Sequence, residues 1–239
     1  MNDGFVNEKM LVDYINQPYE SYNENIKNFL AFVFGTSLDL RKSFVAEKIG
    51  GQVKPDLSIT HNGERKYISI KKGSGNSVHQ ENIDLFFPFI EKTIGNSALN
   101  YLKLFHYGDD TLNDSGKIRY SAAECKSRYS SEINKLNVEL NKWNNLEKFL
   151  DRFLFIGNIG SCSVDIIYHG NINKGYWASK KDIKEYVKNN KFSRDAVHFG
   201  PLTYQVWGRN EKGTAVHPER RYVMQVKWGS ITQDLINLK

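Results

Sequence analysis

The stretch Lys54–Lys72, KPDLSITHNGERKYISIKK, decides the fold of the chain around it. Its two runs of alternating residues are separated by Asn62-Gly63, which favours the type I′ turn of a two-residue β-hairpin because both central positions need a positive φ. With that turn His61 pairs with Glu64, and the pairing continues outward by one residue at a time on both strands. We therefore predict a hairpin over residues 53 to 72.

The register of this hairpin determines which side chains share a face. Asp56 falls opposite Ser69, and directly opposed residues project from the same side of a sheet. Lys71, two residues beyond Ser69, projects from that side too and lies in diagonal reach of Asp56. The other side is predicted to carry the apolar residues Leu57, Ile59, Ile68 and Ile70. A carboxylate and an ammonium group are thus expected together on the polar face.

Phosphodiester hydrolysis has a use for such a pair. A divalent cation activates water and neutralises charge in the transition state, and Mg²⁺ is held by one or two carboxylates together with waters and phosphate oxygens. A neighbouring lysine can orient or deprotonate the attacking water and offset negative charge. The alternative interpretation is an exposed Asp56–Lys71 ion pair, worth about 0–1 kcal/mol.

The motif Pro55-Asp56, a spacer, and Ser69-Ile70-Lys71 resembles the active-site hairpin of the PD-(D/E)XK nuclease superfamily, which includes most type II restriction endonucleases. That pattern has Asp or Glu where this chain has Ser69. Some restriction-enzyme subgroups show the same Ser-X-Lys variant and recover the carboxylate from the following helix. Glu81, ten residues after Lys71 and early in a predicted helix, stands where that substitute is expected.

The resemblance implies metal binding by Asp56 and Glu81, a catalytic role for Lys71, and a place for Ser69 in the same site. It implies Mg²⁺ as the cofactor, with Mn²⁺ able to substitute. The superfamily often adds a carboxylate from upstream of the hairpin, for which the candidates are Glu20, Glu24 and Glu47. Each of these also fits a solvated surface position.

The segment Gly73–Glu81 has two interpretations. A glycine-rich loop that enters a helix can bind phosphate through its backbone amides, whereas a flexible turn capped by Ser77 and Gln80 needs no ligand. On the first interpretation the residues expected to contact DNA are Lys72, Ser74, Asn76 and Gln80.

The C-terminal stretch Gly200–Gly229 is rich in basic and amide side chains. Arginine and glutamine make bidentate contacts to guanine and adenine edges, and a two-stranded ribbon fits the major groove. The candidate DNA-binding residues here are Gln205, Arg209, Arg220, Arg221, Gln225 and Lys227, in a stretch that also holds Lys212 and His217. The alternative is a solvated hairpin that packs its valines and Trp207 on the core.

Hydrophobic spacing and stop signals indicate further elements. We predict helices over 23–34, ended by Gly35, over about 77–92, interrupted by Pro88, over 122–155 as one long pattern, and over 179–189, capped by Ser179. A long helix can also form a coiled-coil dimer, although packing within the domain is the preferred interpretation. Strands are predicted over 164–168, 202–207 and 222–228.

Composition bounds the class of protein. The 239 residues are 40% hydrophobic and 25% charged, as in an ordinary globular chain, and the formal charge of +6 is compatible with a nucleic-acid partner. No apolar run approaches the roughly 18–20 residues of a membrane span, and the start lacks signal-peptide features. The two cysteines, Cys125 and Cys162, match no metal-ligand spacing, so a cytoplasmic setting is expected.

These patterns predict one mixed α/β nuclease domain over residues 1–239. It would have a restriction-endonuclease-like core of a central mixed sheet flanked by helices at about 20–110, a helical elaboration at about 120–156 and a DNA-contacting part with a β-hairpin at about 160–239. The predicted function is Mg²⁺-dependent cleavage of double-stranded DNA by a sequence-specific type II restriction endonuclease, as a homodimer with a cognate methyltransferase in the same system. The alternatives are a non-specific or nicking defence or repair nuclease, and a catalytically degenerate DNA-binding module.

Overall fold

The computed structural model describes residues 3–73, 76–209 and 218–238, and it shows a mixed α/β protein. Contacts divide the chain into two compact units. Unit 1 comprises Met1–Asn76, Asp151–Asn189 and Ser230–Lys239, and unit 2 comprises Ser77–Leu150 and Asn190–Gly229. The segments of the two units alternate along the chain, while the division into three consecutive regions of one domain stays a prediction.

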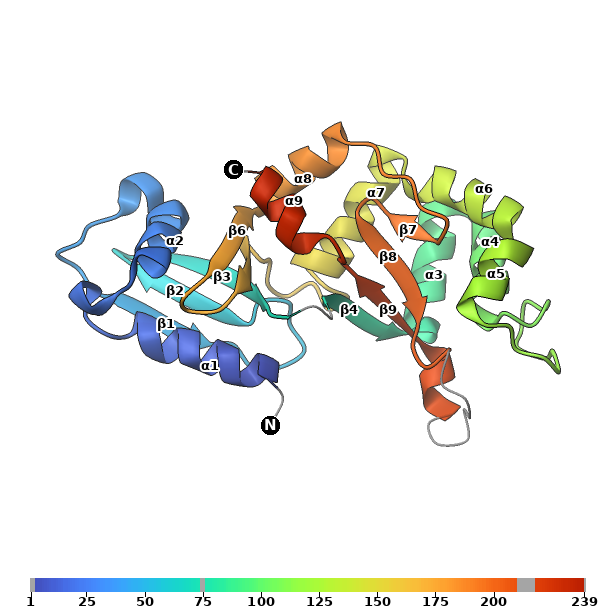
Figure 1. The fold of residues 1–239 in the computed structure, drawn as a ribbon, viewed down its shortest axis with the longest axis horizontal. Coiled ribbons are helices and arrows are strands. Elements are labelled where there is room, and N and C mark those ends of the chain that lie inside the picture. The colour runs from blue at the N-terminus through green and yellow to red at the C-terminus, as the bar shows by residue number, and fades with distance from the viewer. Residues whose placement is uncertain (1–2, 74–75, 210–217, 239) are drawn as a thin grey trace. The chain divides into compact units, whose positions relative to one another are not determined.

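Unit 1 contains a five-stranded mixed sheet in the order β1-β2-β3-β5-β6 (Figure 1). The strands β1, β2 and β3 form an antiparallel meander, β5 runs parallel to β3, and β6 is antiparallel to β5. Their bounds are Phe44–Lys48 (β1), Leu57–His61 (β2), Glu64–Lys71 (β3), Ile166–Gly170 (β5) and Gly175–Ser179 (β6).

The predicted register of the β2–β3 hairpin is confirmed. His61 pairs with Glu64 and Leu57 with Ile68. The turn residues Asn62 and Gly63 have φ values of 49° and 80°, as a type I′ turn requires. The local sequence therefore sets this register without help from distant contacts.

Two helices supply the apolar core against this sheet, α1 (Asp3–Ile15) and α2 (Glu24–Phe34). Short 3₁₀ turns follow each of them, η1 (Tyr19–Ser21) and η2 (Gly35–Ser37). Phe29 of α2 packs edge-on against Tyr168, with ring centroids 4.8 Å apart. The hairpin residues buried in this cluster are the predicted four, Leu57, Ile59, Ile68 and Ile70.

The ends of α2 also follow the sequence. The Asn23 side chain accepts a hydrogen bond from the Ile26 amide at the N-terminus, and Gly35, at φ 48°, follows the last turn. Unit 1 is completed by the π-helical turn Asp151–Phe155 (η3), by α8 (Lys180–Asn189) and by α9 (Ile231–Asn237). Ser179 caps α8 as predicted, since its hydroxyl accepts from the Asp182 amide at 3.1 Å.

Unit 2 contains a four-stranded antiparallel sheet in the order β4-β9-β8-β7. The bounds are Ser77–Asn82 (β4), Val223–Lys227 (β9), Leu202–Val206 (β8) and His198–Phe199 (β7). The two predicted C-terminal strands are thus confirmed. A 3₁₀ turn, η4 (Pro218–Tyr222), precedes β9.

The helix predicted over 77–92 is wrong in its first half. Residues 77–82 form β4 because they pair with β9, and the helix α3 (Ile83–Ile94) begins only after Asn82, whose side chain caps the Asp84 amide. The proposed cap by Ser77 and Gln80 is therefore absent, because both residues lie in a strand. Pro88 stands inside α3 without ending it.

The long helix predicted over 122–155 is also wrong, because it is broken into α5 (Ala122–Arg128), α6 (Ser130–Leu140), α7 (Trp143–Leu150) and η3. Side chains near the second break bond to a distant segment. The Asn137 amide donates to the Ala196 carbonyl at 3.0 Å, and Asn141 accepts from the Gly200 amide at 2.7 Å. α4 (Asn96–Tyr107) packs against α6, so the apolar face is used within the unit rather than in a coiled coil. None of the described helices is long and apolar enough to cross a membrane.

A buried histidine predicts how unit 2 responds to acid. His106 Nε2 donates to the Arg221 carbonyl at 2.9 Å, so neutral Nδ1 accepts from the Tyr204 hydroxyl at 2.6 Å. Burial lowers the pKa of His106 from 6.5 to about 3. The unfolded chain therefore binds more protons between these values, and stability present above pH 6.5 is lost as the pH falls toward 3, by up to about 1.4 kcal/mol per pH unit.

We expect the variant His106→Asn to be less stable at pH 7 but to lose less stability between pH 7 and pH 4 than the unaltered protein. Urea unfolding of both proteins across this range measures the difference, and the acidic groups common to both cancel. Parallel pH profiles for the two proteins would contradict the assignment.

Candidate active site

Asp56 directly precedes strand β2, and its backbone is hydrogen-bonded on both sides. Its amide donates to the Ile68 carbonyl at 2.9 Å, and its carbonyl accepts from the Ile49 amide at 3.0 Å. Pro55 precedes it and is buried. The main chain that carries this carboxylate is therefore held between β1 and β3.

The Asp56 carboxylate gathers the polar groups that the sequence predicted around it. Oδ2 accepts from the Ser69 hydroxyl at 3.0 Å and from the Ile70 amide at 2.6 Å. Lys71 Nζ lies 3.4 Å from the same oxygen. The predicted placement of Asp56, Ser69 and Lys71 on one face is confirmed. The Ile70 amide bonds to the carboxylate instead of to a strand backbone, and this bond holds the carboxylate in place.

This group remains open to solvent in part. The Asp56 side chain is 24% exposed and that of Lys71 is 19% exposed, whereas Ser69 is buried. The Asp56 carboxylate fits Mg²⁺, which is held by one or two carboxylates and takes its remaining ligands from water and phosphate. No three His, Cys, Asp or Glu side chains gather into a metal cluster within the described residues, an arrangement that Mg²⁺ does not require.

His169 is a neighbour of this group that the sequence did not reveal. It stands beside Lys71 in the parallel β3–β5 register. Its Nε2 lies 3.3 Å from the Gly73 carbonyl and its Nδ1 3.3 Å from the Thr232 hydroxyl on α9. Burial lowers the pKa of His169. No local pattern signals this residue, because its pairing joins strands that are far apart in the sequence.

Glu81 lies in unit 2, on strand β4 rather than in a helix. It is opposite the buried Met224, and its carboxylate is 2.6 Å from Nε2 of His79. Both side chains of this pair are nearly inaccessible, at 2% for Glu81 and 6% for His79. The expected helical position of Glu81 is therefore wrong, while its role as a metal ligand stays a prediction.

The variant Glu81→Gln tests that role. As a metal ligand, Glu81 should support catalysis far more than folding, so the variant should lose cleavage about 100-fold or more and keep most of its stability. Cleavage rates and urea unfolding are measured on the same preparations. Full cleavage together with reduced stability would mean that the Glu81–His79 pair is structural and would leave the upstream glutamates as candidates.

The three upstream glutamates are all exposed residues of unit 1. Glu24 pairs with Lys27 at 3.2 Å on α2, and Glu20 lies in the turn η1. Glu47 pairs with Arg65 at 2.5 Å, and the strand registers place it on the same side of the sheet as Asp56. Glu47 is therefore the one of the three that shares a sheet face with the hairpin site.

The described residues between Lys71 and strand β4 form no helix N-terminus. Lys72 is exposed, Gly73 has a φ of 82°, Ser74 lies outside the described residues, and Asn76 has a φ of 43°. Because strand β4 follows, the predicted phosphate cradle lacks the helix on which it depended.

All three candidate arginines in the C-terminal region have partners inside unit 2. The Arg209 guanidinium donates to the carbonyls of Phe105 and His106, and Arg221 forms an ion pair with Asp114. Arg220 lies over the Trp207 ring, 4.6 Å from its centroid. Lys212 and His217, also in this basic stretch, lie outside the described residues.

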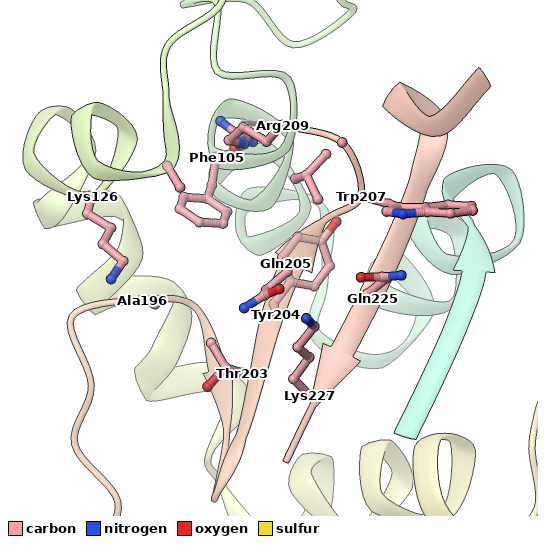
Figure 2. A pocket seen from close by; sticks show the side chains of 13 residues that line it. Phe105, Lys126, Ala196, Thr203, Tyr204, Gln205, Trp207, Arg209, Gln225 and Lys227 are labelled. Atoms are coloured by element: carbon pink, nitrogen blue, oxygen red, sulfur yellow. The ribbon is translucent and has the colours of Figure 1, made fainter. Parts of the chain in front are cut away.

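The remaining candidates gather on one sheet face. Gln80, Gln225 and Gln205 lie side by side on β4, β9 and β8. Beside them is a hollow of about 530 Å³ whose lining includes Gln205, Gln225 and Lys227 (Figure 2). This is the polar surface of unit 2 that the sequence assigned to DNA.

No protein-family model matches the chain, and no curated protein matches it in sequence.

Proposed function

We propose that this protein is a Mg²⁺-dependent endonuclease that hydrolyses DNA phosphodiester bonds, with a restriction-endonuclease-like core in unit 1. The observation that carries the proposal is that the side chains of Asp56, Ser69 and Lys71 are in contact at the end of one hairpin. A solvated ion pair needs neither the buried hydroxyl nor the backbone amide that hold the carboxylate in place.

Each group has a separate task in this proposal. Asp56 would hold the cation, and the cation would supply an activated water and charge to neutralise the phosphate. Ser69 and the Ile70 amide hold the Asp56 carboxylate in one orientation. Lys71 orients the attacking water and offsets the charge that develops on the phosphate oxygens.

The architecture of unit 1 supports the same proposal. Its mixed sheet carries the hairpin at the centre, with β1 on one side and β5 on the other. Strands paired on both sides hold a site more rigidly than a loop does, and catalysis depends on such rigidity.

Cleavage of supercoiled plasmid DNA tests the proposal. We expect nicked and linear products with Mg²⁺ or Mn²⁺ and none with EDTA. Discrete fragments from phage DNA would support sequence-specific restriction, whereas a smear would indicate a non-specific nuclease. No metal-dependent cleavage on any DNA would contradict the proposal.

A DNA-binding module with a degenerate site is the second candidate. Ser69 replaces an acidic residue, and Glu81 is buried beside His79. Both observations favour this candidate over a complete two-carboxylate site. It predicts DNA binding without cleavage in the same assay.

One such site cuts one strand, so double-strand cleavage calls for two copies of the chain and the restriction proposal includes a homodimer. The same proposal includes a cognate methyltransferase as a partner. Sedimentation with and without a cognate duplex measures the number of copies. A monomer on DNA that still cuts both strands together would contradict the dimer.

A further inference from the structure

The outer face of the unit 2 sheet is a polar surface built from three strands. Opposed residues share a face, and three rows of them lie across β4, β9 and β8. The middle row is Gln80, Gln225 and Gln205. The flanking rows are Ser77, Lys227 and Thr203 on one side and Asn82, Val223 and Trp207 on the other. We call these nine residues the glutamine face.

The inner face of the same strands is closed, and it combines apolar side chains with the buried Glu81–His79 pair of β4. Tyr204, Val206, Met224 and Val226 are buried there, at 8% exposure or less. On the glutamine face, by contrast, Gln80 and Gln205 are exposed and Gln225 and Lys227 are half-buried. The polar side chains are therefore displayed outward by strand alternation.

The charge of this face is suited to an anionic partner. None of its nine residues is acidic, Lys227 lies within it, and Arg220 stacks on Trp207 at its edge. Lys126 lines the adjoining hollow opposite Lys227, and its ammonium is paired with Asp195 at 3.1 Å (Figure 2). Phosphate groups are attracted to such a surface without specific contacts.

The glutamine row adds the chemistry of base recognition. The Gln225 amide nitrogen donates to the Gln80 amide oxygen at 3.0 Å, so this pair holds the Gln225 side chain in one orientation. A glutamine amide matches adenine in the major groove, where it accepts from N6 and donates to N7. Strands spaced about 4.8 Å apart place the outer two glutamines roughly 10 Å apart, within the roughly 12 Å width of the groove.

We propose that the glutamine face reads adenine in the major groove of duplex DNA, through Gln205 and Gln225, with Gln80 as a positioning residue. This inference rests on DNA as the partner in the proposed function and specifies which bases the protein selects. It also transfers base reading from arginine to glutamine, because Arg209 and Arg221 are bonded inside the unit.

Selection from a pool of random duplexes, with EDTA present to prevent cleavage, tests the inference. We expect the selected sites to contain a fixed adenine. On a selected duplex, Gln205→Ala and Gln225→Ala should each bind about 5- to 150-fold more weakly and accept other bases at one position. The matched control Gln233→Ala removes an exposed glutamine of α9 and should bind as the unaltered protein does.

Two further measurements separate base reading from other effects. Replacing the fixed adenine with 7-deazaadenine removes the N7 acceptor, so the unaltered protein should bind about 3- to 10-fold more weakly while the affected glutamine variant should not respond. Lys227→Ala should weaken binding equally on all sequences and reduce the salt slope by about one.

The inference is overturned if the selected sites show no adenine, if both glutamine variants keep full discrimination, or if single strands bind more tightly than duplexes. If both glutamine variants cleave DNA as the unaltered protein does, with the same sequence preference, this inference is contradicted and the nuclease proposal stays intact. Adenine-dependent binding without cleavage would contradict the nuclease proposal and leave this inference intact.

Discussion

Asp56→Asn is expected to lower Mg²⁺-dependent DNA cleavage on the order of 10³-fold while leaving DNA binding largely unchanged. The amide still accepts hydrogen bonds from the Ser69 hydroxyl and the Ile70 amide, so the hairpin should keep its geometry. Only the charge that holds the cation is lost. Single-turnover rates measure cleavage, and binding isotherms recorded in the presence of EDTA measure affinity for DNA separately.

Asp165→Asn is the matched control for this variant. The Asp165 carboxylate accepts from the Tyr67 amide at 2.8 Å, so it bonds to the backbone of β3 as Asp56 does. We expect the control to cleave within a few-fold of the unaltered protein. Cleavage by Asp56→Asn at the level of the control would refute Asp56 as a metal ligand.

Lys71→Ala is expected to be inactive in cleavage yet competent in binding, whereas Lys72→Ala should be mild. Lys71 lies 3.4 Å from the Asp56 carboxylate. Lys72 follows the last residue of β3 and is exposed. Removing one preorganised charge at the reacting group costs about 10²- to 10³-fold.

The two lysine variants control for each other, because each removes one positive charge from neighbouring positions. Cleavage rates are compared at several salt concentrations, where a general electrostatic effect would shrink. Equal losses in the two variants would mean that Lys71 acts only through the overall charge of the region.

The sequence by itself determined the centre of the candidate site. Asn62-Gly63 sets the hairpin register, and that register brings Asp56, Ser69 and Lys71 onto one face. The same holds for α2, whose cap at Asn23 and stop at Gly35 lie within one turn of its ends. These features depend on residues close in the chain, so local conformational preferences suffice to fix them.

Only the tertiary structure decided the form of segments whose partners are distant. Residues 77–82 carry no strong local preference and become strand β4 because β9 offers them a ladder of hydrogen bonds. The helical pattern of 122–155 breaks near Asn141, where side chains of Asn137 and Asn141 satisfy backbone groups of residues 196–200. Buried polar groups require partners, and that requirement outweighs helical periodicity.

Distant pairing likewise decided which predicted residues are displayed and which are enclosed. Arg209 and Gln205 stand in the same basic stretch, yet the guanidinium bonds to the carbonyls of α4 while the amide faces outward. The approach of His169 to Lys71 depends on the parallel pairing of β3 with β5. Such parallel pairing needs a long crossover between strands, and sequence spacing cannot specify it because the choice of partner depends on how the whole unit buries its apolar surface.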